Sequence, residues 1–178
     1  SEEIKVMPRL ILDLNKTTDL KLLEGQWKVA TGLVPGEYNE GLQSQLLDAT
    51  ARQVEYDDSG WAICNDIRHS LSEGFTFAWY RLNLIIPDEI DASNISQYRV
   101  FFETNFDNYG EVWIDGDIDR NAGVISGINS QQRVEIDRSQ GRDGNHLIAC
   151  LVVNGPLAKP RGGIFIRYAY LAFELTDD

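Results

Sequence analysis

Long hydrophobic runs are absent from the 178-residue sequence, and no apolar stretch approaches the roughly 18 residues that a membrane-spanning helix requires. The first residues also lack a basic segment leading into an apolar run, which favours a cytoplasmic location. Basic residues are scarce, with 16 lysines and arginines against 28 aspartates and glutamates, and the formal net charge is -12. Because such a charge repels nucleic acid and anionic membranes, neither is expected as a partner.

Cysteine is nearly absent too, since the chain contains only Cys64 and Cys150 and no Cys-x-x-Cys pair. Cys150 lies in the apolar run 147–153, and Cys64 follows the apolar residues Trp61–Ile63. Two separate buried thiols are therefore expected, with a single disulfide as the alternative.

Signatures of metal sites and of common catalytic centres are missing as well. His69 and His146 do not have the spacing of zinc ligands, and no Gly-x-Ser-x-Gly elbow or Gly-rich phosphate loop occurs. Acidic residues alternate from Asp115 to Asn121, but Arg120 and Ser126 stand where a calcium loop needs glycine and glutamate. An EF-hand is excluded, and Asp115-Gly116 is interpreted as a turn between strands.

Short segments of alternating or continuous apolar character are what the sequence contains instead, and turns rich in glycine and asparagine separate them. This pattern predicts an all-β fold, an antiparallel β-sandwich that forms a single domain over residues 1–178. One short helical insertion is expected within Gly32–Thr50, where apolar residues have near-helical spacing. The predicted strands cover residues 10–14, 26–30, 52–56, 61–64, 75–86, 98–104, 109–115, 133–136, 147–153 and 164–175. Polar turns are predicted over Asn15–Asp19 and over Asp57–Gly60.

The longest predicted strand, Phe75–Ile86, has two different faces. One face carries Phe77, Trp79 and Arg81. A strand face that contacts only water does not need two aromatic rings and a guanidinium group. It either cradles a ligand or is covered by a loop, with Arg81 pairing a carboxylate such as Glu103. The predicted core face carries Ala78, Tyr80, Leu82, Leu84 and Ile86.

A second candidate region is the polar stretch that separates two predicted strands. It contains Glu103, Asn105, Asp107, Asn108 and Tyr109. Sugar hydroxyl groups pair with carboxylates and amides, and the apolar face of a pyranose stacks on an aromatic ring, so these residue types fit a sugar site. The alternative is a hairpin loop that uses aspartate and asparagine for their turn propensity. Arg161, between a proline and a glycine, is expected to donate from a rim loop or to pair with the acidic surface.

Several of these segments resemble the sugar-binding domain of family 2 glycoside hydrolases, which is a galactose-binding-like jelly roll. The resemblance begins with Asp57-Asp58-Ser59-Gly60-Trp61 and Phe77-Ala78-Trp79-Tyr80-Arg81 and continues, in the family's order, through 111–116, 144–149 and 162–164. It implies a jelly roll that binds a sugar. Because many members of this superfamily hold a structural calcium ion, the resemblance also allows a structural calcium ion here. In that family catalysis belongs to a separate barrel domain, for which this chain is too short.

Together these observations favour a noncatalytic module that binds a carbohydrate or another small polar ligand, without a cofactor. A small-molecule enzyme of cyclase, lyase or hydrolase type is the alternative, with Glu103 or Asp107 as general acid or base and Tyr109 or His69 orienting the substrate. An interaction domain with an acidic surface is a third hypothesis. The predicted ligand-binding residues are Phe77, Trp79, Arg81, Glu103, Asn105, Asp107, Tyr109 and Arg161.

Overall fold

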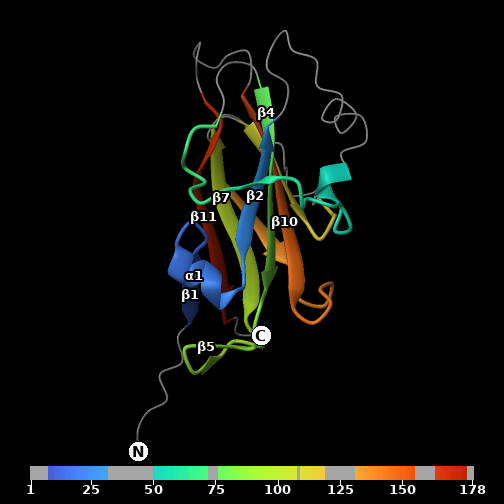
Figure 1. The fold of residues 1–178 in the computed structure, drawn as a ribbon. Coiled ribbons are helices and arrows are strands. Elements are labelled where there is room, and N and C mark those ends of the chain that lie inside the picture. The colour runs from blue at the N-terminus through green and yellow to red at the C-terminus, as the bar shows by residue number, and fades with distance from the viewer. Residues whose placement is uncertain are drawn as a thin grey trace, which may run out of the picture.

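The computed structural model describes residues 8–31, 50–71, 76–107, 109–118, 131–154 and 163–175. Strands dominate these ranges, and the helices are short (Figure 1). The elements are β1 (Arg9–Asp13), α1 (Thr17–Leu22), β2 (Gln26–Thr31), η1 (Thr50–Arg52), β3 (Ala62–Ile63), β4 (Thr76–Ile85), β5 (Glu89–Ile90), β6 (Ser93–Asn94), β7 (Arg99–Asp107), β8 (Tyr109–Ile114), β9 (Gln131–Ile136), β10 (Asn145–Asn154) and β11 (Phe165–Glu174).

Two antiparallel sheets make up the body of the molecule. One has four strands in the order β1-β11-β7-β9, and the other has five strands in the order β3-β2-β4-β10-β8. The hairpin of β5 and β6 lies at the lower end in Figure 1. Since residues of both sheets share one buried cluster, the sheets pack face to face, and the predicted antiparallel β-sandwich is confirmed.

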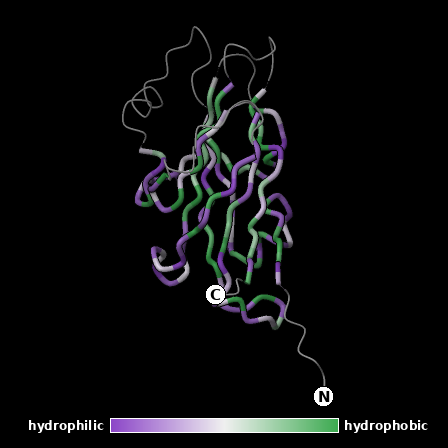
Figure 2. Tube along the Cα trace, turned by 180° about the vertical axis from the view of Figure 1, so that it is seen from behind, coloured by the Kyte–Doolittle hydropathy of each residue, from purple (hydrophilic) through white to green (hydrophobic). Residues whose placement is uncertain are grey.

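Alternation along the strands decides which side chains enter the space between the sheets, and hydrophobic and hydrophilic residues accordingly mix along the strands in Figure 2. The whole predicted core face of β4, from Ala78 to Ile86, lies in the main buried cluster. Trp27 is 1% exposed; its indole Nε1 donates to the Leu14 carbonyl at 2.8 Å, and its ring meets Tyr80 edge-on. Both cysteines are buried and free, as expected, and burial raises the pKa of Cys64 and of Cys150.

Two local predictions are wrong. The segment predicted as a strand over Arg52–Tyr56 instead forms η1 and the turns after it, because its carbonyls accept hydrogen bonds from a side chain rather than from a neighbouring strand. The turn predicted over Asn15–Asp19 runs into helix α1. The helix expected within Gly32–Thr50 lies outside the described residues, apart from Thr50 in η1. No described helix is long and apolar enough to cross a membrane.

The turn predicted at Asp115-Gly116 is confirmed. Asp115 and Gly116 have φ values of 52° and 85°, the two positive angles of a type I′ turn. Ile114 and Asp117 exchange backbone hydrogen bonds of 2.8 and 3.0 Å on either side of it. The carboxylate of Asp115 accepts from the Leu147 amide at 2.8 Å, which fixes this turn to the start of β10.

Helix α1 ends in a Schellman motif whose left-handed position is not glycine. The Gly25 amide donates to the Leu20 carbonyl at 2.9 Å, and the Glu24 amide donates to the Lys21 carbonyl at 3.3 Å. Glu24 has a φ of 50°, a conformation that costs an L-residue free energy because its Cβ crowds the backbone.

We therefore expect Glu24→Gly to raise the free energy of unfolding by about 0.5 to 1 kcal/mol, the relief of left-handed strain less the extra chain entropy of glycine. Urea denaturation measures this change. Glu24→Ala is the control, since it removes the same carboxylate but keeps the Cβ. A gain of equal size in Glu24→Ala would show that charge, not backbone strain, is responsible.

Candidate functional site

The outer face of the five-stranded sheet is covered around Phe77 and Trp79. Phe77 and Trp79 are 7% and 2% exposed, and with Ala51 they belong to a second buried cluster on this face. Tyr56 and Trp61 pack against the cluster from the segment that follows η1, and their rings contact each other at 5.5 Å between centroids. Figure 1 shows the teal segment that contains η1 beside β10. The sequence left two interpretations of this face, a ligand site or cover by a loop. For Phe77 and Trp79 the structure shows cover by a loop.

Arg81 holds the covering segment in place. Its side chain is 1% exposed, and its guanidinium donates to the carbonyls of Ala51, Gln53 and Tyr56. Nε of Arg81 lies 2.9 Å from Oδ2 of Asp58, and the same guanidinium stacks over the Tyr56 ring at 5.2 Å. The buried charge is thus paired and hydrogen-bonded on several sides, as burial of a guanidinium requires.

Asp58, which sequence reasoning had placed only in a turn, is therefore the carboxylate partner of Arg81. The prediction that Arg81 pairs a carboxylate under a covering loop is confirmed, but the example named for it, Glu103, is not the partner, because β4 and β7 belong to different sheets. Lys28 adds a second cation to Asp58, with Nζ 3.2 Å from Oδ1. The neighbouring Asp57 accepts hydrogen bonds from Ser59, which lower the pKa of its carboxyl.

The other predicted ligand residues lie on the opposite side of the sandwich. Asn105 and Asp107 lie on strand β7, not in a loop, and alternation turns both of them and Glu103 to the outer face of the four-stranded sheet. Tyr109 begins β8 and belongs to the five-stranded sheet. The predicted set is thus divided between two faces with the core between them. Arg161 and Asn108 lie outside the described residues.

Two tyrosines join Glu103 and Asn105 on the outer face of the four-stranded sheet. Tyr168 pairs with Asn105 across β11 and β7, and Tyr170 pairs with Glu103. The two rings stack, with centroids 5.2 Å apart and planes 18° from parallel, and both are partly exposed. The next strand adds Arg133 opposite Glu103. We call Tyr168, Tyr170, Glu103, Asn105 and Arg133 the tyrosine surface.

Sequence reasoning missed both tyrosines, although alternation against Ala169 and Leu171 places them together on one face of the last strand. The sequence does not show the strand register that places this pair beside Glu103 and Asn105. Those two residues lie more than sixty positions earlier in the chain.

A closed ring of ion pairs includes Glu103 and Arg133 of the tyrosine surface and extends to Arg9 and Glu174. Arg9 lies 2.6 Å from Glu103 and 3.1 Å from Glu174, while Arg133 lies 2.5 Å from Glu103 and 2.6 Å from Glu174. The guanidinium of Arg133 also lies 3.7 Å from the ring centroid of Phe101, which is 8% exposed. Hydrogen bonds from Arg133 lower the pKa of the Glu174 carboxyl, and those bonds raise the pKa of Arg133.

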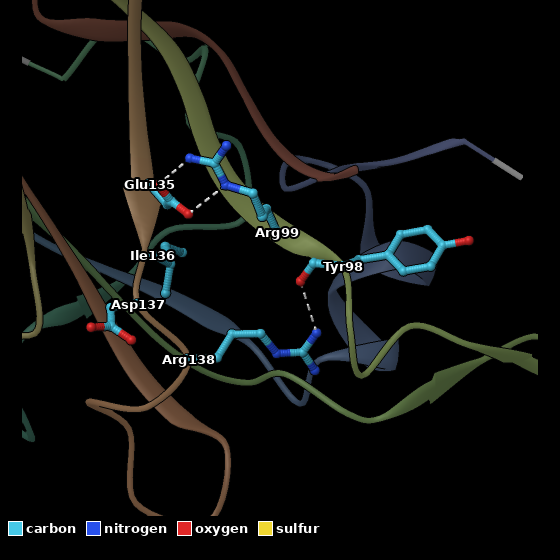
Figure 3. Close-up of a pocket in the computed structure, with 6 residues that line it drawn as sticks. All are labelled: Tyr98, Arg99, Glu135, Ile136, Asp137 and Arg138. Atoms are coloured by element: carbon cyan, nitrogen blue, oxygen red, sulfur yellow. Dashed lines mark hydrogen bonds and ion pairs between the residues drawn. The ribbon is translucent and has the colours of Figure 1, made fainter. Parts of the chain in front are cut away.

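An open groove of about 500 Å³ lies where β7 begins and β9 ends (Figure 3). Arg99 and Glu135 face each other across it through two hydrogen bonds of 2.9 and 2.6 Å. Arg138 donates to the carbonyls of Tyr98 and Pro87 at 3.3 and 3.2 Å, so its guanidinium is hydrogen-bonded to the backbone. The groove walls are therefore already paired internally.

The two histidines differ in their surroundings. His146 is 3% exposed, and its Nδ1 lies 2.7 Å from Oδ2 of Asp115, so it connects β10 to the Asp115 turn. His69 is exposed in a turn after Asp66. Among the residues that the structure describes, no group of three or more histidine, cysteine or carboxylate side chains could hold a metal ion. The structural calcium ion stays a prediction of the resemblance.

Comparison with solved structures identifies this fold within larger sugar-processing enzymes. Bacteroides uniformis β-glucuronidase 2 matches 93% of this chain with a TM-score of 0.63 and 16% identity, over 18% of its own chain. A family 2 glycosyl hydrolase from Bacteroides cellulosilyticus matches 94% (TM-score 0.58, 14% identity), over 21% of its chain. Faecalibacterium prausnitzii β-glucuronidase matches 98% (TM-score 0.60, 11% identity), over 33% of its chain.

The TM-scores show a shared fold, and the resemblance predicted from the sequence is confirmed at that level. The chain spans a fifth to a third of the length of these enzymes. No family model and no curated protein sequence matches it.

We expect Arg81→Met to lower the free energy of unfolding by about 3 kcal/mol or more, because it leaves Asp58 and three backbone carbonyls without their buried donor. Chemical denaturation followed by tryptophan fluorescence measures this. Lys28→Met is the matched control; it removes the other cation from Asp58, but at a partly exposed site where an ion pair contributes about 1 kcal/mol or less. Equal losses in both variants would show that the guanidinium does not hold the segment.

Arg133→Gln tests the ion-pair ring through its pH dependence. The folded pKa of Glu174 lies below its ordinary value of 4.5, so the stability from this pair is present above that value and is lost as pH falls through the folded pKa. The variant should be less stable than the wild type by up to about 1 kcal/mol at neutral pH, since the groups are partly exposed and screened.

This difference should shrink as the pH falls below 4.5 and through the folded pKa of Glu174, in urea titrations at each pH. Arg142→Gln is the control, because Arg142 has no ion pair among the described residues. A difference between Arg133→Gln and wild type that stays constant to low pH would rule out the carboxylate pairing as its source.

Proposed function

We propose that this chain is a noncatalytic module that binds a carbohydrate or a similar small polar ligand, and that the tyrosine surface is where it binds. The observation that carries the proposal is the position of the partly exposed Tyr168 and Tyr170 beside the partly exposed Glu103 on one sheet face, with Asn105, 7% exposed, next to them. Tyrosine offers a flat apolar ring and a hydroxyl group at low cost in side-chain entropy. The carboxylate of Glu103 next to it supplies an acceptor for sugar hydroxyls.

The fold supports the same proposal by analogy. The solved structures that share it are named as β-glucuronidases and as a family 2 glycosyl hydrolase, and in each the shared part is a minor fraction of the chain. A sandwich of this kind therefore occurs as one portion of sugar-processing proteins. Analogy of fold is weaker support than the geometry of the surface, because one fold hosts many functions.

The surroundings of the acidic residues favour binding over catalysis. Glu103 contacts two guanidinium groups, and Asp107 lies 2.7 Å from Nη2 of Arg167. Neither carboxylate lies in the apolar surroundings in which enzymes typically place a general acid. Tyr109 lies in the other sheet, and His69 lies in an exposed turn. The arrangement therefore fits recognition through stacking and hydrogen bonds.

The test is a screen of saccharides by thermal shift, followed by calorimetric titration of those that stabilise the protein. Tyr170→Ala should weaken binding by about tenfold or more, because it removes both a stacking ring and a hydroxyl group. Ile63→Ala is the control, since Ile63 is 61% exposed on an edge strand of the other sheet. The proposal fails if no saccharide stabilises the wild type, or if Ile63→Ala weakens binding as much as Tyr170→Ala.

A further inference from the structure

We infer that the ligand of the tyrosine surface is uncharged, a neutral polyhydroxyl compound such as a neutral saccharide, and that the surface rejects anionic saccharides. This inference rests on the proposed function and adds the chemical class of the ligand. It follows from where the arginines of this face direct their donors, and from which polar groups they leave unpaired.

Each arginine described on the outer face of the four-stranded sheet already contacts a carboxylate of this chain. Arg9 and Arg133 share Glu103 and Glu174, and Arg99 binds Glu135 through two hydrogen bonds. Arg167, farther along the face, contacts Asp107. A ligand carboxylate would have to displace one of these internal partners, and the displaced carboxylate would remain beside it and repel it.

The tyrosine hydroxyls, in contrast, are available. Within the described ranges of the chain, neither the Tyr168 nor the Tyr170 hydroxyl has a hydrogen-bond partner. Burial and the negative charge of Glu103 raise the pKa of Tyr168, so both its environment and its neighbour disfavour added negative charge. A hydroxyl group of a ligand can both donate to Glu103 and accept from a tyrosine, whereas a carboxylate can only accept.

The net charge of the chain also disfavours an anionic ligand. At a formal net charge of -12 the protein has few cations to offer an anionic ligand, and those on this face are neutralised locally. Long-range repulsion of an anion is screened by salt, whereas stacking is not. Discrimination against anionic ligands should therefore weaken as ionic strength rises.

Pairs of sugars that differ only in charge test the inference: glucose with glucuronate, galactose with galacturonate, and mannose with mannuronate. Each is titrated at equal concentration into the isotopically labelled full chain at low salt, and amide and tyrosine ring resonances are followed by NMR. We expect the neutral member of at least one pair to shift the resonances of Tyr168, Tyr170 and Asn105. Its uronate should bind about tenfold more weakly or worse.

Glu103→Gln provides the complementary variant. It leaves Arg9 and Arg133 with Glu174 as their shared carboxylate and removes the charge beside the tyrosines. Uronate binding should strengthen relative to the neutral sugar, by at least threefold for the pair in which the wild type binds. Circular dichroism of the variant confirms that the sheet is intact, and Ile63→Ala should keep the wild-type preference.

The outcomes separate the two proposals. A uronate that binds the tyrosine surface as tightly as its neutral counterpart overturns the inference but leaves the proposed function standing. Failure of Glu103→Gln to change the preference also overturns the inference. Absence of shifts at the tyrosine surface with every sugar, neutral or charged, overturns the proposed function itself.

Discussion

The buried guanidinium of Arg81 holds a covering segment over Trp79 on one outer face of this sandwich. A charge that is 1% exposed must be satisfied in full, and here three carbonyls and Asp58 of the segment after η1 satisfy it. The same contacts tie that segment across Trp79, which is 2% exposed in a small buried cluster on the outer face of the five-stranded sheet. The four-stranded sheet has no comparable anchor among its described residues, and its outer face carries the partly exposed Tyr168 and Tyr170, where we propose that a ligand binds.

Alternation along single strands is the part of the structure that the sequence could predict. The core face of β4, the buried side of β8 and the Asp115-Gly116 turn follow from side-chain period and from turn chemistry, which are local. The division of the predicted site is not local. Trp79 and Asn105 lie on consecutive long strands, yet β4 pairs with β2 and β10 while β7 pairs with β11 and β9. Only the strand order, set by long-range pairing, separates them.

The tyrosine surface illustrates the same limit. Tyr168 and Tyr170 stand two apart on β11, which alternation alone predicts as a shared face. Their position beside Asn105 and Glu103 depends on the register of β11 against β7, and that register contains an irregularity between Ile166 and Tyr168. Without the shift, the residues after it would pair one position away and face the core instead. A surface built across strands, such as the proposed binding surface, therefore cannot be predicted from the sequence even where its members can be recognised.

The ion-pair ring has more to do with the shape of the surface than with the stability of the fold. Its four side chains are 20 to 44% exposed, and pairs at such sites contribute little free energy. Each member nevertheless has two partners, and the ring holds Glu103 in one orientation and lays Arg133 over Phe101. Side chains fixed before a ligand arrives lose less entropy when it binds. A neutral ligand gains nothing from long-range attraction, so its binding depends more on this reduced loss of entropy than the binding of a charged ligand does. Stacking recognition on an acidic protein is therefore favoured by a rigid ion-pair ring whose charges neutralise one another.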